Sequence, residues 1–189
     1  MDYRGCGDKM KKAFVFWFTG LSGSGKTTIV DIVVEHFSRI GKTCKIFDGD
    51  AVRKDINRHL NFCPEDIREN NRIIAELCLE EMDKYDFIFV PVISPFQEPR
   101  DRARDILGST FFLIYCQASL EEVMRRDPKG LYRKVLSGEI DNFIGFHANV
   151  PFQPPTNADL ILDTQSEDME ISGGRLIQFI TAKTEKKLD

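Results

Sequence analysis

The strongest constraint on the fold is a glycine-rich segment that lies between a strand pattern and a helix pattern. Residues 20–27 read Gly-Leu-Ser-Gly-Ser-Gly-Lys-Thr and fit the pattern G-x-x-x-x-G-K-[ST] in full. The apolar run Ala13–Thr19 precedes it, and Lys26–Ile40, with apolar residues at helical spacing, follows it. Glycines allow the backbone to turn its N–H groups inward, and the start of a helix attracts anions. The pattern therefore predicts a phosphate-binding loop. The alternative, a glycine-rich turn with a chance lysine, would not need a strand before it and a helix after it.

The residue types of this loop indicate individual tasks. Lys26 is expected to bridge the β- and γ-phosphates of a nucleoside triphosphate, and the Thr27 hydroxyl is expected to bind Mg²⁺. The expected nucleotide-binding residues are Gly20, Ser22, Gly23, Ser24, Gly25, Lys26, Thr27 and Thr28. The loop predicts where a nucleotide binds but not which reaction takes place there.

The rest of the chain alternates between apolar runs and helix-like patterns. Expected strands are residues 13–19, 43–47, 87–93, 111–116 and 160–162, and expected helices are 26–40, 64–84, 98–107, 119–127 and 171–187. Such alternation is typical of an α/β fold with a parallel sheet. We expect five parallel strands with helices on both faces, and a Ser119 cap with Glu122 at the capping-box position.

Length and composition limit the domain count and the partners. A chain of 189 residues predicts a single domain at 13–189, after a flexible tail at 1–12. Residues 128–156, rich in Gly and Pro, predict a mobile lid within that domain. A net charge of −4 argues against polymeric nucleic acid as a partner, and the longest apolar run is too short for a membrane helix. Five cysteines without a C-x-x-C pair predict reduced, mostly buried thiols in a cytoplasmic protein.

Two aspartates follow the expected second strand. Asp48-Gly49-Asp50 lies at the carboxyl end of that strand, where the phosphate loop also lies. Phosphoryl transfer to a hydroxyl needs a group that accepts the proton and carboxylates that hold Mg²⁺. The third strand ends in Ile93-Ser94-Pro95-Phe96 and offers no aspartate, so Asp48 and Asp50 take these roles. The alternative is a glycine turn with solvated aspartates.

Cations and aromatic residues complete the candidate site. Arg53 follows Asp50 by one helical turn and is expected to bind an acceptor anion. The segment Arg125-Arg126-Asp127-Pro128-Lys129 begins the lid, where cations neutralise transferred charge. Most other arginines of the middle of the chain are expected on a solvated face. The side chains of Phe62, Phe143 and Phe146 fit either the core or a stack on a base.

Together these pieces resemble the adenylylsulfate kinase family. The matching stretches, all within residues 18–164, are FTGLSGSGKTT, FDGDAVR, NFCPEDIRENNR, ISPFQEPRDRAR, RRDPKGLYRKVLSGEIDNFIGF and DLILDT. The resemblance implies a P-loop NTPase fold and a phosphotransferase with an alcohol group as acceptor. The family moves the γ-phosphoryl group of ATP to the ribose 3′-hydroxyl of adenylyl sulfate, with Mg²⁺. Its members are often dimers, so the resemblance also allows a homodimer.

The resemblance implies roles for individual residues. Asp50 is expected to activate the acceptor hydroxyl and, with Thr27, to bind the metal; Lys26, Ser94 and Lys129 complete the catalytic set. Ser94 matches a serine described in the family as a phosphoserine intermediate, but direct in-line transfer needs no such stop, so its hydroxyl is expected to orient a substrate. The expected substrate-binding residues are Asp48, Arg53, Phe62, Asn70, Ile93 and Phe143, and Arg126 joins the nucleotide-binding set.

Two departures from the family pattern concern the acceptor. Ile67 stands where the family has an arginine, and His147-Ala148-Asn149-Val150 replaces an acidic part of the lid. These changes fit either neutral drift or a different nucleotide diphosphoester acceptor, such as cytidine diphosphoramidate, with His147 and Asn149 bonding to another base. A non-catalytic nucleotide-binding regulator or GTPase-like switch is the third alternative. The intact Lys26, Thr27 and Asp50 and the lack of an N-K-x-D loop argue against it.

Overall fold

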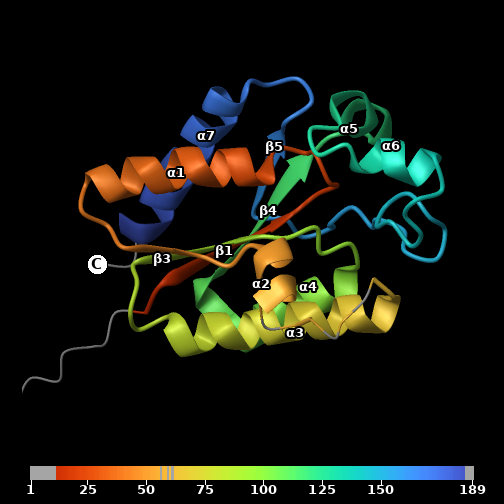
Figure 1. The fold of residues 1–189 in the computed structure, drawn as a ribbon. Coiled ribbons are helices and arrows are strands. Elements are labelled where there is room, and N and C mark those ends of the chain that lie inside the picture. The colour runs from red at the N-terminus through yellow and green to blue at the C-terminus, as the bar shows by residue number, and fades with distance from the viewer. Residues whose placement is uncertain (1–11, 56, 59, 61, 186–189) are drawn as a thin grey trace, which may run out of the picture.

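The structure, a computed structural model, contains a five-stranded parallel sheet (Figure 1). It describes residues 12–55, 57–58, 60 and 62–185, so the expected tail lies outside the described residues except for Lys12. The strands are β1 (Phe14–Thr19), β2 (Cys44–Ile46), β3 (Phe87–Pro91), β4 (Phe111–Gln117) and β5 (Leu160–Asp163). Their order across the sheet is β2-β3-β1-β4-β5. The expected parallel sheet of five strands is therefore confirmed.

Helices cover both faces of this sheet, as the sequence predicts. The helices are α1 (Lys26–Arg39), α2 (Gly49–Asp55), α3 (Pro64–Glu81), α4 (Gln97–Leu107), α5 (Leu120–Arg126), α6 (Leu131–Leu136) and α7 (Met169–Glu185), with a short 3₁₀ turn at Gly108–Thr110. In Figure 1, α1 and α7 lie above the sheet and α3 and α4 below it. Helices α5 and α6 lie beyond the carboxyl ends of the strands.

Strand β1 shows why the sheet needs cover on both faces. All six of its residues are buried, and successive side chains point to opposite faces. Val15 and Trp17 pack with residues of α3 and α4. Phe14, Phe16 and Phe18 pack on the other face with residues of α1 and α7. An unbroken apolar strand of this kind is typical of the centre of a parallel sheet.

Two short helices were not expected from apolar periodicity, because local capping determines them. Helix α2 begins at Gly49, and its first free N–H groups, those of Asp50 and Ala51, donate to Asp48 Oδ1 at 2.9 and 3.1 Å. Helix α6 lies inside the region expected as a lid, residues 128–156, which we call the lid segment. Asp127 accepts hydrogen bonds from the backbone N–H groups of Tyr132 and Arg133, both at 3.1 Å.

The expected cap of α5 is confirmed in part. The Ser119 hydroxyl accepts a hydrogen bond from the Glu122 N–H at 3.2 Å. The Glu122 carboxylate does not complete a capping box, because it binds Arg125 and Arg126 instead. The Ser119 N–H donates to Gln165 Oε1, which joins α5 to the loop after β5.

The thiols and helices of the described residues bear on two further expectations. Cys44, Cys63, Cys78 and Cys116 are free cysteines, of which Cys78 and Cys116 are buried and the other two partly exposed. Cys6 lies outside the described residues. Among the helices that the structure describes, none combines the length and the apolar character that a membrane span requires.

Candidate active site

The phosphate loop joins the end of β1 to the start of α1. Lys26 is buried, and its ammonium group donates hydrogen bonds to the carbonyl oxygens of Gly20 at 2.9 Å and Leu21 at 2.7 Å. Burial lowers the pKa of Lys26 to about 8, because the charged form loses its water. Gly20 has a φ of +147°, and a Cβ atom there would lie 2.5 Å from the Cys116 carbonyl oxygen. The loop therefore curls tightly around its own lysine.

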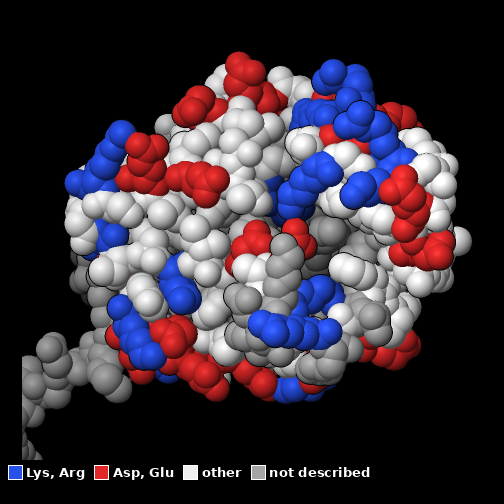
Figure 2. All heavy atoms as spheres, in the orientation of Figure 1, with Lys and Arg blue, Asp and Glu red and all other residues white. Residues whose placement is uncertain are grey.

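This loop forms one wall of a cavity of about 700 Å³. The lining residues are Ser22, Gly23, Gly25, Lys26, Thr27, Thr28, Asp48, Gly49, Asp50, Phe62, Pro91, Val92, Ile93, Arg126, Pro128, Lys129, Leu131, Ile140, Asp141, Asn142, Phe143, Ile144 and Met169. Figure 2 shows a hollow in this face of the molecule, with basic and acidic side chains beside it. Most of the expected nucleotide and acceptor residues therefore face one shared space.

An ion pair joins Asp50 of α2 to the lid segment across this cavity. Lys129 Nζ lies 3.0 Å from Asp50 Oδ2, although the two residues are 79 positions apart in sequence. Both side chains are more than half exposed, at 58% and 66%, so the pair contributes little to stability. Its significance is positional, because it places the lysine expected in catalysis beside the carboxylate expected to accept a proton.

The oxygen atoms near the loop fit a magnesium ion. The exposed Thr27 and the carboxylate of Asp50 line the same cavity. Mg²⁺ prefers oxygen ligands and usually keeps several waters while it binds one or two carboxylates and phosphates. Within the part of the chain that the structure describes, no cluster of three or more His, Cys, Asp or Glu residues could hold a metal alone. The residues present therefore suit an ion that arrives with phosphates.

Arg126 provides an unmet hydrogen-bond donor at the nucleotide side. Its Nε donates to Glu122 Oε1 at 2.6 Å, and Nη2 donates to the Thr164 carbonyl at 2.7 Å. Its Nη1 is buried and has no hydrogen-bond partner among the described residues. The hydrogen bonds from Arg125 and Arg126 lower the pKa of Glu122 to about 2. A buried donor without a partner is costly, so a ligand in this cavity could satisfy it.

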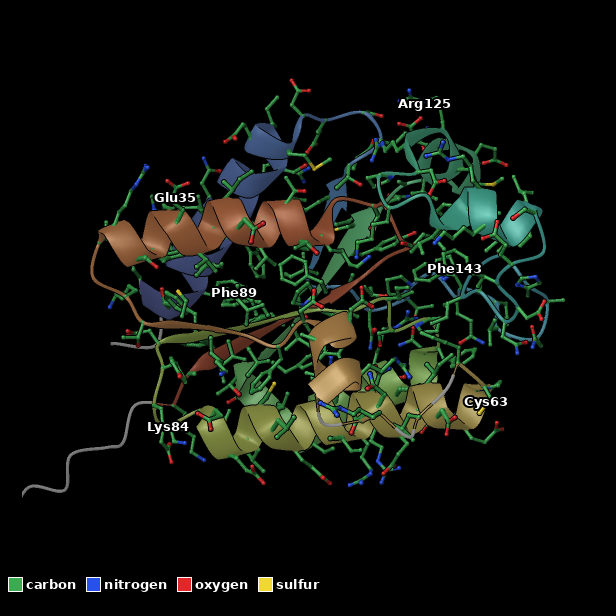
Figure 3. All side chains as sticks on the ribbon, in the orientation of Figure 1. Glu35, Cys63, Lys84, Phe89, Arg125 and Phe143 are labelled. Atoms are coloured by element: carbon green, nitrogen blue, oxygen red, sulfur yellow. The ribbon has the colours of Figure 1, made fainter. Side chains whose placement is uncertain are left out.

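Aromatic residues form the acceptor side of the cavity. Phe62 is 46% exposed, and the Arg53 guanidinium lies over its ring at 4.6 Å. Phe143 lies in the lid segment, below α6 in the view of Figure 3. It meets the Tyr132 ring edge to face, with the ring centres 5.0 Å apart. Ile93 adds a third apolar wall.

Several expected site residues do not line this cavity. They are Gly20, Ser24, Arg53, Asn70 and Ser94. Asn70 is buried and accepts a hydrogen bond from Asn57 Nδ2 at 2.9 Å. Ser94, only 2% exposed and with a φ of +42°, accepts one from Asn71 Nδ2 at 2.9 Å. In this geometry the Ser94 hydroxyl belongs to a buried network rather than to the cavity surface.

The two departures from the family pattern meet each other in the fold. Ile67 is 2% exposed and packs in one apolar cluster with Phe96 and, from the lid segment, Ile144 and Val150. The position expected to face an acceptor anion is thus part of an apolar contact between α3 and the lid segment.

His147 and Asn149, which the sequence predicts as possible contacts of an acceptor base, both have hydrogen-bond partners inside the lid segment. His147 Nδ1 accepts a hydrogen bond from the Phe143 N–H at 2.9 Å, and Asn149 Nδ2 donates to Asn142 Oδ1. His147 lines a second cavity, of about 630 Å³, whose other walls include Leu21, Tyr115 and Phe152. Both side chains therefore form hydrogen bonds that stabilise the turn of the lid segment.

Arg100 is the buried residue that the sequence interpretation missed. It is 1% exposed, whereas most arginines of this region were expected on a solvated face. Its guanidinium donates to Thr19 Oγ1, to the Ser94 and Gln153 carbonyls and to Gln97 Oε1. Burial lowers its pKa to about 10. A signal was present, because Arg100, Ala103 and Leu107 recur at the spacing of one helix face.

Comparisons with known proteins agree with this geometry. The family model described as adenylylsulphate kinase matches residues 12–163. An adenylyl-sulfate kinase of Staphylococcus epidermidis is 40% identical over 89% of this chain and 84% of its own length. One from Bacteroides thetaiotaomicron is 41% identical over 92% of this chain and 86% of its own length. A Mycobacterium tuberculosis APS kinase solved with AMPPNP and APS is 34% identical, with a TM-score of 0.84 over 90% of this chain and 98% of that one.

Proposed function

The chain belongs to the adenylylsulphate kinase family, and from that membership we propose that it phosphorylates adenylyl sulfate with ATP. The γ-phosphoryl group would pass to the ribose 3′-hydroxyl and give 3′-phosphoadenylyl sulfate. One observation carries the proposal. Lys26 of the phosphate loop, Asp50 of α2 and Lys129 of the lid segment line one cavity, with Lys129 and Asp50 only 3.0 Å apart.

The donor half binds ATP through the loop and Arg126. Loop N–H groups and the start of α1 stabilise the phosphates, and the Lys26 ammonium turns from the loop carbonyls to the β- and γ-phosphates. The unpartnered Nη1 of Arg126 binds the nucleotide beside the loop. Thr27 and Asp50 would hold Mg²⁺, which would neutralise phosphate charge when bound.

The acceptor half supplies the proton acceptor and holds the sugar in line. Asp50 accepts the proton of the 3′-hydroxyl while the oxygen forms its bond to the γ-phosphorus. The bond from that phosphorus to the bridging oxygen breaks, and ADP leaves with the electron pair. Lys129 stabilises charge on the transferred group, and Phe62 and Phe143 hold the base of the acceptor between their rings. Arg53, Asn70, Ile93 and Ser94 act around the same acceptor, the buried ones by holding its walls.

The setting of the reaction is also a proposal. We infer a cytoplasmic enzyme with a small nucleotide as its partner, working as a homodimer. The free thiols of the described residues support the compartment. The dimer rests on the family resemblance.

A second acceptor is favoured by one specific observation. Ile67, which stands in place of a family arginine, is buried against Ile144 and Val150 and offers no charge to an anionic end group. An acceptor whose end group carries less negative charge would lose less from this change. The same chemistry on cytidine diphosphoramidate is therefore the alternative.

Mass spectrometry of products separates the two acceptors. The protein is incubated with ATP, Mg²⁺ and either adenylyl sulfate or cytidine diphosphoramidate, with Lys26→Ala as the blank. We expect adenylyl sulfate to gain one phosphoryl group, and at a higher rate than cytidine diphosphoramidate. A higher rate on the cytidine compound would establish the alternative. If neither acceptor gains a phosphoryl group, both proposals are contradicted.

A further inference from the structure

Tyr132 of α6 makes a contact that the proposed function does not use. The side chain is buried, at 2% exposure, although α6 belongs to the lid segment. Its hydroxyl donates a hydrogen bond to the Ser22 carbonyl oxygen in the phosphate loop at 3.1 Å. Burial raises the pKa of Tyr132, so the hydroxyl keeps its proton and remains a donor.

This contact constrains a peptide unit that faces the phosphates. Ser22 and Gly23 both line the main cavity. The peptide bond between them is planar, and in a trans peptide the N–H points opposite to the C=O. A donor that fixes the Ser22 carbonyl therefore also fixes the direction of the Gly23 N–H, one of the groups available to a phosphate oxygen.

The same ring also supports the acceptor side. Its face-to-edge contact with Phe143 holds a residue that lines the cavity from the lid segment. Tyr132 thus touches the phosphate loop with its hydroxyl and the acceptor wall with its ring.

A second contact ties the same two elements together. Leu21, the residue before Ser22, packs with Val123 and Tyr132. Gly145 of the lid segment has a φ of +82°, and a Cβ atom there would lie 2.2 Å from Leu21 Cδ2. A side chain at position 145 would therefore strain the backbone and require Leu21 to shift.

We propose that Tyr132 is a positioning residue that couples the phosphate loop to the lid segment. It ties the orientation of the Ser22–Gly23 peptide to the placement of Phe143, so that nucleotide on the loop orders the acceptor wall. The inference goes beyond the proposed function and rests only on its ATP half, since it holds for either acceptor.

Tyr132→Phe tests the coupling, because it removes the hydroxyl and keeps the ring against Phe143. Tyr85→Phe is the matched control, because Tyr85 is a partly buried tyrosine that packs against the core on the α3 and α4 face of the sheet, away from α6. Two quantities are measured on each full-length variant: the Kd for AMPPNP with Mg²⁺, and the hydrogen-exchange protection that this nucleotide adds to residues 128–156. Loss of one hydrogen bond predicts about a fivefold weaker Kd and about a fivefold smaller gain in protection for Tyr132→Phe, with neither change for Tyr85→Phe.

A purely structural role gives a different result. Tyr132→Phe would then lower the melting temperature but leave the Kd and the nucleotide-induced protection within about twofold of wild type, which would overturn the inference. Gly145→Ala disturbs the contact with Leu21 and should also reduce the protection that the nucleotide adds at residues 128–156. Unchanged protection in both Tyr132→Phe and Gly145→Ala would overturn the inference as well. Wild-type protein that binds AMPPNP without protecting the lid segment would overturn the coupling alone. Failure to bind AMPPNP would overturn the proposed function first.

Discussion

On its donor side the cavity is built mainly from one loop, with lining residues between Ser22 and Thr28 and with Arg126 added from α5, whereas its acceptor side is assembled from distant segments. The acceptor side combines residues 48–50 with Phe62, Pro91–Ile93 and the lid segment. The donor loop is held by hydrogen bonds within itself, such as those from Lys26 to the loop carbonyls. The acceptor walls are held by contacts between elements, such as Lys129 with Asp50.

This difference teaches where the specificity of such an enzyme can change. A loop that depends on each of its own residues tolerates little substitution, because a change at one glycine or lysine alters the whole loop. In walls contributed by separate segments, two residues that contact each other can be substituted together. Ile67 and Val150, both at departures from the family pattern, pack in the same apolar cluster. We therefore expect substitutions to be tolerated more readily on the acceptor side than in the donor loop.

Lys26→Ala tests the donor side and should have the largest effect. Removal of the ammonium group leaves the transferred charge without its main cation, so kcat/KM is expected to fall at least about 10³-fold. The fold should persist, because the side chain binds only groups of its own loop. Lys84→Ala, in the turn after α3, is the control for loss of a lysine. A steady-state rate within about tenfold of wild type would contradict the role of the loop.

Asp50→Asn tests the acceptor side and should have the next largest effect. The amide cannot accept the hydroxyl proton, so kcat is expected to fall about 10²- to 10⁴-fold while the Kd for ATP stays nearly constant. Single-turnover rates and calorimetric ATP titrations measure the two quantities, with the exposed Asp105→Asn as control. If ATP affinity alone is lost, Asp50 serves only as a metal ligand and another group accepts the proton.

The pH dependence of ATP binding tests how tightly the donor loop encloses Lys26. Its pKa of about 8 lies below the ordinary 10.5, so the lysine is cationic below that pH and becomes neutral above it. ATP needs the cation, so the Kd for ATP should rise about tenfold for each pH unit above 8. The Lys26→Arg variant keeps its charge at these pH values. Its Kd for ATP should be higher than that of the wild type but should not change with pH. A wild-type Kd that stays flat to pH of about 10 would show that Lys26 is not desolvated before ATP binds.

His147→Ala sharpens the description of the acceptor side and should have the smallest effect. Its ring accepts a hydrogen bond within the lid segment and faces the second cavity. We expect a stability loss of about 1 kcal/mol in urea unfolding and a change in the KM of the acceptor below about twofold. The exposed His36→Ala is the control. A tenfold rise in acceptor KM, on the order of 1.4 kcal/mol, would place His147 against the substrate.

The sequence predicts those parts of the fold and site that depend on neighbouring residues. The strands, the long helices and the phosphate loop follow from apolar periodicity and from one motif, and the structure confirms them. Helices α2 and α6 escape such prediction, since the carboxylates of Asp48 and Asp127 determine them by capping.

Contacts between distant residues limited the prediction of the site. The place of Ser94 depends on Asn71, and that of Tyr132 on Ser22, which lies 110 positions away. No pattern in either segment reveals these partners. For Arg100, the spacing to Ala103 and Leu107 indicates a buried helix face, whereas charge alone predicts solvent exposure.

The four hydrogen bonds of Arg100 have a consequence for how this protein responds to heat. One guanidinium joins β1, the loop after β3, the first turn of α4 and the end of the lid segment. A lysine ammonium has three donors in a different geometry and cannot reach all four oxygens. Arg100→Lys is therefore expected to lower the melting temperature, so that activity survives at low temperature and is lost on heating.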